Sequence, residues 1–386
     1  MDKKIKAIVG GVIYTPQKRI EEGVVLVSDK KITALGEVDI PKDAQIIEAK
    51  DKIITPGFID LHIHGGAAHD FMDASFEAID AISKIHSQYG TTSLLATTLT
   101  ASHDEILKAI RAINQAIERG TSGAKILGIH LEGPYISKEK KGAQNPDYIR
   151  LPELGEAKEL IKEGKGNIKI VVLAPEVKGS KELIRYLVRE GIVVSCGHSN
   201  ADYEETISGI EEGITQATHT FCAMSGLHHR AAGAVGAILT SDKVISEIIA
   251  DGVHVHPPVI KILIKTKGIE RIVLITDCVQ ALGLPEGEYN LGGLKVTYRE
   301  GAIRIDKDTL AGSVLTMNKA VENMVRLVGL SLREALFMAT LNPARVLKIA
   351  DKKGSLQEGK DADLVIMDKN FKVVMTIVEG KIVYGV

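Results

Sequence analysis

Apolar runs alternate with segments of helical period through the middle of the chain. Each run is rich in Val, Ile, Leu or Thr, and the segments between runs carry apolar residues three or four positions apart. This alternation is typical of repeated strand-helix units that build a parallel sheet. The eight runs are residues 58–64, 92–98, 126–133, 169–175, 192–199, 214–220, 246–252 and 271–277.

The intervening segments predict helices. The clearest are residues 75–89, 103–118, 181–190, 203–212, 314–328 and 332–339. Eight units over roughly 290 residues favour an α/β fold of the (β/α)8 TIM-barrel type over an open doubly wound sheet. No Gly-rich phosphate-binding motif opens the first helix, which further disfavours the doubly wound alternative.

The two ends of the chain have a different pattern. Residues 1–55 and 350–386 contain short apolar runs separated by turns, such as IKAIVGGVIY and FKVVMTIVEGKIVYG. Neither end has enough strands to bury a sheet face alone. We therefore expect both ends to form one small discontinuous β-sandwich domain, with residues 56–349 inserted in it as the barrel.

Composition narrows the class of partner. The net charge is -2 and no block of Lys or Arg is present, which argues against nucleic acid or an anionic membrane. The sequence contains no long uncharged apolar run and no signal-peptide pattern, so we expect a cytoplasmic protein with a small-molecule substrate. Cys196, Cys222 and Cys278 do not form a disulfide framework, and we expect reduced thiols.

Candidate metal ligands lie at the ends of the predicted strands, where barrel enzymes place their chemistry. His62 and His64 share one face of the first strand, because the intervening Ile63 points the other way. Five further residues have the same placement at later strand ends: Glu132, His198, His219, His254 and Asp277. All of them are expected to meet at one mouth of the barrel.

Each candidate also has a structural interpretation. A single histidine after a strand is more often a hydrogen-bonded core or loop residue than a ligand. Glu132 and Asp277 are stronger candidates, since a carboxylate is costly to bury without a cation. We expect His130 to support the ligands from behind. Structural or surface roles are expected for His69, His86, His103 and His256.

Histidine nitrogens combined with carboxylates suit Zn²⁺ or Fe²⁺, and a shared carboxylate can bridge two ions. Water bound to such an ion loses a proton near neutral pH. A nearby carboxylate can accept that proton and later deliver it to a leaving amine. The constellation therefore predicts a hydrolase.

The chain contains seven distinctive motifs: PGFIDLHIHG, LEGPYISKEKKGAQNP, GHSNADYEE, QATHTFCAMSGLHHR, IADGVHVH, VLITDCVQALG and LAGS. Together they resemble those of the N-acetylglucosamine-6-phosphate deacetylase family of the amidohydrolase superfamily. The similarity covers essentially the whole chain. It implies a homodimer that hydrolyses N-acetylglucosamine-6-phosphate to glucosamine-6-phosphate and acetate, with one or two divalent ions per subunit.

The resemblance also implies roles for individual residues. Glu132, His198 and His219 hold the principal ion, while His62 and His64 hold a second ion with Glu132 as the bridge. Asp277 is the catalytic base and acid. The implied substrate-binding residues are Ala143, Gln144, Cys222, Ala223, His254, Leu310, Gly312 and Arg230. Arg230 is implied to bind the phosphate, and one interpretation places this contact across the dimer interface.

Two residues depart from the family pattern. Gln144 stands where the family often has His, and Cys222 where it often has Asn. Gln144 can donate a hydrogen bond but carries no charge, whereas the backbone N–H groups of Cys222 and Ala223 stay available to phosphate. These departures leave open another N-acyl sugar, such as N-acetylgalactosamine-6-phosphate, or a different amide. A non-catalytic protein on this scaffold is disfavoured, because every expected ligand is present.

Overall fold

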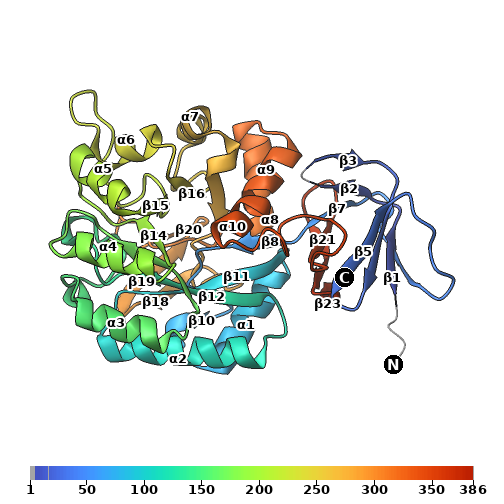
Figure 1. Cartoon of the computed structure of the whole chain (residues 1–386), viewed down its shortest axis with the longest axis horizontal. Coiled ribbons are helices and arrows are strands. Elements are labelled where there is room, and N and C mark those ends of the chain that lie inside the picture. Colours follow the sequence, from blue (N-terminus) through green and yellow to red (C-terminus); the bar gives the residue numbers. More distant parts are fainter. Residues whose placement is uncertain (1–4, 16, 386) are drawn as a thin grey trace.

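The middle of the chain forms a barrel of eight parallel strands, each next to its neighbour in sequence (Figure 1). The computed structural model describes residues 5–15 and 17–385. The barrel strands are β8 (Phe58–Asp60), β11 (Thr91–Thr98), β12 (Lys125–Glu132), β13 (Ile168–Leu173), β14 (Val193–Cys196), β15 (Ile214–Ala217), β16 (Ile245–Ile249) and β17 (Ile272–Ile275). The predicted (β/α)8 architecture is confirmed.

The barrel closes just beyond the ends of β8 and β17. The Asp277 N–H donates to the His62 carbonyl at 2.9 Å, and the His64 N–H donates to the Cys278 carbonyl at 2.8 Å. Deeper in this seam, the buried Asp60 carboxylate accepts the Thr276 hydroxyl at 2.5 Å. Burial raises the pKa of the Asp60 carboxyl to about 7. The residues that join the barrel are therefore also the residues that carry candidate ligands.

Helices surround the barrel on its outer side (Figure 1). They are α1 (Phe76–Ser87), α2 (His103–Arg119), α3 (Leu154–Glu163), α4 (Ser180–Arg189), α5 (Tyr203–Glu212), α6 (Gly233–Thr240), α7 (Pro257–Lys267), α8 (Met317–Asn323), α9 (Leu332–Ala339) and α10 (Leu341–Val346). Local capping fixes several starts: Ser102 and Glu105 form a capping box at α2, and Asp202 and Glu205 form another at α5.

One predicted helix begins later than expected. Residues 314–316 lie outside α8, because Ser313 belongs to the barrel seam: its N–H donates to the Asp277 carbonyl at 2.8 Å, and its hydroxyl accepts the Leu315 N–H at 2.9 Å. The last turn, Met324–Val328, is π-helical rather than α-helical. The sequence period gave no signal for either feature.

Strands from both chain ends build two further sheets beside the barrel (Figure 1). One has the order β5-β4-β1-β6 and the other β23-β22-β21-β7-β2-β3. Their bounds are β1 (Lys6–Val9), β2 (Val12–Tyr14), β3 (Arg19–Ile20), β4 (Val24–Ser28), β5 (Lys31–Gly36), β6 (Gln45–Glu48), β7 (Ile53–Pro56), β21 (Leu364–Met367), β22 (Val373–Val378) and β23 (Lys381–Gly385). β7 pairs with both β2 and β21, so one sheet joins the two ends. The two sheets share an apolar cluster that includes Ile8, Ile54 and Leu364. The domain boundaries at 55/56 and 349/350 stay a prediction.

A three-stranded sheet that the sequence analysis did not anticipate follows β17. It consists of β18 (Gly287–Leu291), β19 (Leu294–Arg299) and β20 (Ala302–Arg304). A separate two-stranded ribbon, β9 (Gly65–Gly66) and β10 (His69–Asp70), lies between β8 and α1 in the chain. Gly292 and Gly293 both have positive φ in the tight turn between β18 and β19. This GG turn between alternating residues was an available hairpin signal.

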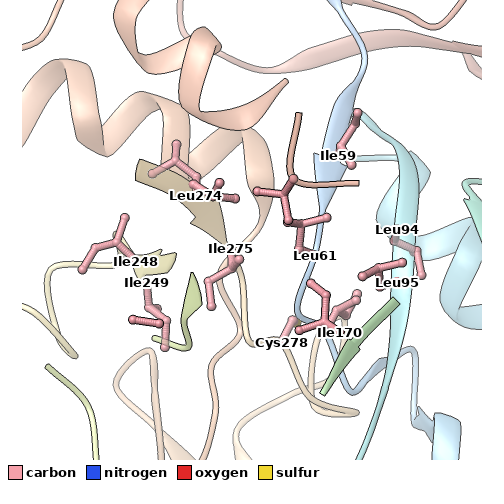
Figure 2. Close-up of a cluster of buried hydrophobic side chains, with 14 of the residues drawn as sticks. Ile59, Leu61, Leu94, Leu95, Ile170, Ile248, Ile249, Leu274, Ile275 and Cys278 are labelled. Carbon is pink, nitrogen blue, oxygen red and sulfur yellow. The ribbon is translucent and has the colours of Figure 1, made fainter. Parts of the chain in front are cut away.

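The barrel core is a single large apolar cluster (Figure 2). Leu61, Ile170 and Ile275 represent its contributions from different parts of the barrel, and each is at most 1% exposed. Cys196 and Cys278 are buried in this core, and none of the three cysteines is in a disulfide. Among the described residues, no helix combines the length and the apolar character that crossing a membrane requires.

Candidate active site

Four histidines converge on the carboxylate of Glu132, the last residue of β12. Oε1 of Glu132 lies 3.1 Å from His219 Nε2, 3.2 Å from His198 Nε2 and 3.4 Å from His62 Nε2. Oε2 lies 3.2 Å from His64 Nε2. All five side chains are buried. The structure thus brings together the residues that the sequence analysis named as metal ligands.

Asp277 faces the same cluster from the barrel seam. Its Oδ1 lies 3.3 Å from His64 Nε2 and 3.4 Å from His62 Nε2, and the two Nε2 atoms are 3.2 Å apart. Asp277 is 8% exposed, which leaves part of its carboxylate open to the cavity described below. It is therefore placed both to contact an ion and to exchange a proton with a bound molecule.

The backbone turns sharply at three of these residues. His198, His219 and Asp277 have φ values of 48°, 30° and 49°, a region that residues other than glycine seldom occupy. Each follows the end of a barrel strand, and the loops are fixed by backbone hydrogen bonds such as Ser137 N–H to the His198 carbonyl at 2.9 Å. Such conformations persist where surrounding structure over-determines them, and they concentrate at functional sites.

The hydrogen-bond pattern fits a bound cation. Nδ1 of His198 lies 2.8 Å from the Lys140 carbonyl, so Nδ1 is a donor. In the neutral ring that a metal requires, Nε2 then presents a lone pair toward Glu132. A lone pair and a carboxylate oxygen 3.2 Å apart repel each other unless positive charge lies between them. Within the described part of the chain, the ion pairs of Glu132 and Asp277 all involve histidines. This donor set suits a divalent first-row metal.

The pKa values report the same need for positive charge. Burial opposes ionisation of Glu132, but the surrounding imidazoles outweigh it and hold the pKa of the carboxyl well below its usual range. They likewise lower the pKa of Asp277 to about 2, while Glu132 and Asp277 raise the pKa of His64 to about 9 despite its burial. Protons on the imidazoles or metal ions between the ligands satisfy this balance, and binding of a metal releases those protons.

The cluster opens into a cavity of about 390 Å³. The expected residues that line it are Ala143, Gln144, Cys222, Ala223, His254, Leu310 and Gly312. Residues that the sequence analysis did not name also line it: Leu99, Glu139, Lys140, Gly142, Leu291, Asp308 and Thr309. Leu291 comes from the unanticipated sheet, so only the tertiary fold shows that it lines the cavity. The volume of the cavity suits a small molecule.

Comparisons with known proteins identify the family. The Amidohydrolase family matches residues 53–383. The chain belongs to the amidohydrolase family. It is 40% identical over 378 residues to N-acetylglucosamine-6-phosphate deacetylase of Bacillus subtilis, with 96% of this chain and 95% of that protein covered. It is also 37% identical over 370 residues to N-acetylgalactosamine-6-phosphate deacetylase of Escherichia coli, covering 96% and 97%.

Solved structures agree with this amidohydrolase assignment. The N-acetylglucosamine-6-phosphate deacetylase of Pasteurella multocida has a TM-score of 0.93 at 34% identity, covering 98% of this chain and 99% of that one. A variant of the Mycobacterium smegmatis enzyme in complex with N-acetyl-D-glucosamine-6-phosphate has the same TM-score and coverage at 32% identity. The resemblance inferred from the motifs is confirmed, and the family is metal-dependent.

The amidohydrolase holds His254 in one orientation. Its Nδ1 lies 2.6 Å from Asp251 Oδ2, and Asp251 Oδ1 accepts the backbone N–H groups of Val253 and His254 at 2.8 Å each. Asp251 therefore fixes both the ring and the loop that carries it. The sequence analysis missed Asp251. An Asp followed by Gly, as in ADGVH, is a recognisable signal for a turn in which the Asp side chain accepts the backbone N–H two residues later.

Gln144 and Cys222 have specific surroundings in this amidohydrolase. The Gln144 amide donates to Glu132 Oε2 at 2.5 Å, and its oxygen accepts the Thr100 N–H at 2.8 Å. Both ends of the amide are therefore used within the chain. Burial raises the pKa of the Cys222 thiol to about 12, so the cavity wall is neutral at that position.

Arg230 is the predicted site residue that the fold of one chain does not bring to the cavity. It is exposed, and its guanidinium donates to His229 Nε2 at 2.6 Å in a separate surface hollow that His228 also lines. A phosphate contact across a subunit interface stays a prediction.

Three other histidines of the amidohydrolase have partners within the chain. His130 donates from Nδ1 to the Leu61 carbonyl at 2.7 Å, and its ring meets His62 edge-on at 4.5 Å. His86 Nε2 donates to the Gly65 carbonyl at 2.9 Å. His103 pairs with Glu156 at 3.1 Å. One buried residue of the cluster was missed altogether: Glu247 of β16 forms a possible ligand group with His62 and His130.

Proposed function

We propose that this amidohydrolase removes the acetyl group of N-acetylglucosamine-6-phosphate, giving glucosamine-6-phosphate and acetate. The observation that carries the proposal is the convergence of Glu132, His198 and His219 within 3.2 Å contacts, next to Asp277, at the end of a cavity of about 390 Å³. The deacetylases that the chain resembles over nearly its whole length support the choice of substrate.

Glu132, His198 and His219 would hold the principal divalent ion, Zn²⁺ or Fe²⁺. His62 and His64 would hold a second ion, to which Glu132 would also contribute. A bound ion lowers the pKa of water and polarises the acetyl carbonyl. The carboxylates supply the negative charge that keeps such ions in place, and burial of the ligands excludes competing bulk water.

Asp277 is the residue that moves the proton. It accepts a proton from the attacking water and delivers it to the amide nitrogen, which leaves as the amine of the sugar. His254, oriented by Asp251, presents Nε2 to the substrate. The backbone N–H of Ala223 contacts the phosphate, together with Arg230 of a second subunit in a cytoplasmic homodimer. The expectation that the Cys222 N–H is also available is wrong, because it donates to the His219 carbonyl at 2.9 Å.

The second ion has a defined part in this proposal. Gln144 carries no charge, so a second ion held by His62 and His64 would supply more of the stabilisation of the developing oxyanion than residue 144 does. A His62→Ala/His64→Ala variant should therefore lose activity and one equivalent of metal. Parental activity in that variant would refute this part of the proposal.

The decisive experiment is an acetate-release assay after defined metal loading. The substrates are N-acetylglucosamine and N-acetylgalactosamine, each with and without the 6-phosphate. The expected result is the highest kcat/KM with N-acetylglucosamine-6-phosphate. Preference for the 4-epimer would support the second candidate, N-acetylgalactosamine-6-phosphate, which the name of the Escherichia coli relative gives as its substrate. Equal rates with and without phosphate would point to a different amide substrate.

A further inference from the structure

Glu247 is a buried carboxylate that the proposed reaction does not use. It lies in β16, is 0% exposed, and its ion-pair partner among the described residues is His62. Its Oε1 accepts the side-chain amide of Gln216 on the neighbouring strand β15, and its Oε2 lies 3.4 Å from His62 Nδ1. A buried carboxylate is costly unless a cation offsets its charge, so this placement calls for an explanation.

The ring of His62 links Glu247 to the metal cluster. Nδ1 faces Glu247, whereas Nε2 on the opposite edge faces Asp277 Oδ1 at 3.4 Å and His64 Nε2 at 3.2 Å. The ring of His130 packs edge-on against His62 at 4.5 Å and fixes its plane. Only one orientation of His62 therefore serves both Glu247 and the cluster.

A carboxylate at Nδ1 has two physical effects on such a ring. It selects the tautomer with the proton on Nδ1, which leaves the Nε2 lone pair directed at the cluster. When Nε2 binds a divalent ion, the ring becomes more positive and its Nδ1–H donates more strongly, which in turn offsets the charge of Glu247. The buried carboxylate and an ion at Nε2 thus stabilise each other.

We propose that Glu247, held in place by Gln216, is a positioning residue for the second divalent ion at His62 and His64. The inference rests on the two-ion site of the proposed function and extends it to β15 and β16. Its asymmetry is specific: Glu247 contacts His62, whereas the principal ligand His198 is positioned by the Lys140 carbonyl. The two ions therefore depend on different supporting groups.

Metal binding tests the proposal without any sugar. Glu247→Gln keeps the shape of the side chain but removes its charge. Measurements of metal content and chelator competition should show that the second ion binds about 10 to 100-fold more weakly, the usual effect of losing such a supporting group. The principal ion should keep its affinity. In a His62→Ala/His64→Ala background, the same substitution should change nothing further. Unchanged affinity for the second ion, or equal weakening of both ions, would overturn the proposal.

A second variant covers a loss of folding. Gln216→Met leaves the carboxylate in place but removes the amide that orients it, and a smaller weakening confined to the second ion is expected. The backbone contact from the Thr220 N–H to the Glu247 carbonyl, 2.8 Å, is kept in both variants. Parental second-ion affinity in Gln216→Met would count against the role of Glu247. If the parent protein binds only one ion yet releases acetate, this inference and the second-ion part of the proposed function fail, while the proposed deacetylation stands. If Glu247→Gln weakens the second ion as expected but the parent releases no acetate from any substrate of the panel, the inference stands and the proposed function fails.

Discussion

Replacing Gln144 by leucine tests whether its main partner is the metal cluster or the substrate. The side-chain amide donates to Glu132 Oε2 at 2.5 Å and accepts the Thr100 N–H at 2.8 Å. Gln144 is 4% exposed, so neither bond can be replaced readily by water. Leucine has a similar volume, and the change therefore removes two hydrogen bonds while filling most of the same space.

The expected magnitude follows from these two bonds. A hydrogen bond to a charged group contributes about 1.5 to 3 kcal/mol, and a buried N–H left without a partner costs about 1 to 3 kcal/mol. We expect Gln144→Leu to lower the free energy of unfolding by about 3 kcal/mol. Because Glu132 loses a group that orients it, metal affinity should also fall by about 10 to 100-fold.

Urea denaturation of the metal-loaded protein measures the first effect, and chelator competition measures the second. Asn145→Ala is the matched control, since this neighbouring side chain accepts the Asp147 N–H near the surface and does not touch Glu132. The control should change metal affinity by less than about threefold. A Gln144→Leu protein with parental stability and metal affinity but a reduced kcat would refute the reasoning, because it would place the amide against the substrate instead.

Three other predictions test the site and the fold. Asp277→Asn should lower kcat for acetate release by about 10² to 10⁴-fold, and a change under threefold would remove it from proton transfer. Lys353→Met should lower the free energy of unfolding by about 3 kcal/mol, because Asp363, 2.5 Å away, is left buried without its cation; an unchanged urea midpoint would contradict this. Burial lowers the pKa of His86 from 6.5 to about 4. Between these two pH values the unfolded chain binds a proton that the folded chain does not, so the free energy of unfolding decreases as the pH is lowered. Between pH 7 and pH 5 the parent should therefore lose about 2 kcal/mol more than His86→Gln, whereas exposed His256→Gln should behave like the parent.

The sequence was most informative where a local rule decides the structure. Side-chain direction alternates along an extended run, and this alternation predicted that His62 and His64 share one face, although the strand predicted over 58–64 ends at Asp60. The same reasoning placed Glu132, His198 and Asp277 at or just beyond strand ends. It failed at Glu247, although the argument applied to Glu132, that a carboxylate in an apolar strand needs a cation, holds equally for the Glu in SEIIADG. It also missed the sheet after β17, whose GG turn carried a hairpin signal.

Local sequence determined which side chains stand at the strand ends, since side-chain direction in a strand depends only on the neighbouring residues. Tertiary structure decided what those side chains meet. His62 and Glu247 are 185 positions apart, and the closure of the barrel makes them partners. The fold of the loop after β12 decides that the Gln144 amide returns to Glu132, 12 positions away, and the fold of one chain leaves Arg230 on the surface. Such contacts depend on how the whole molecule packs, which local sequence does not determine.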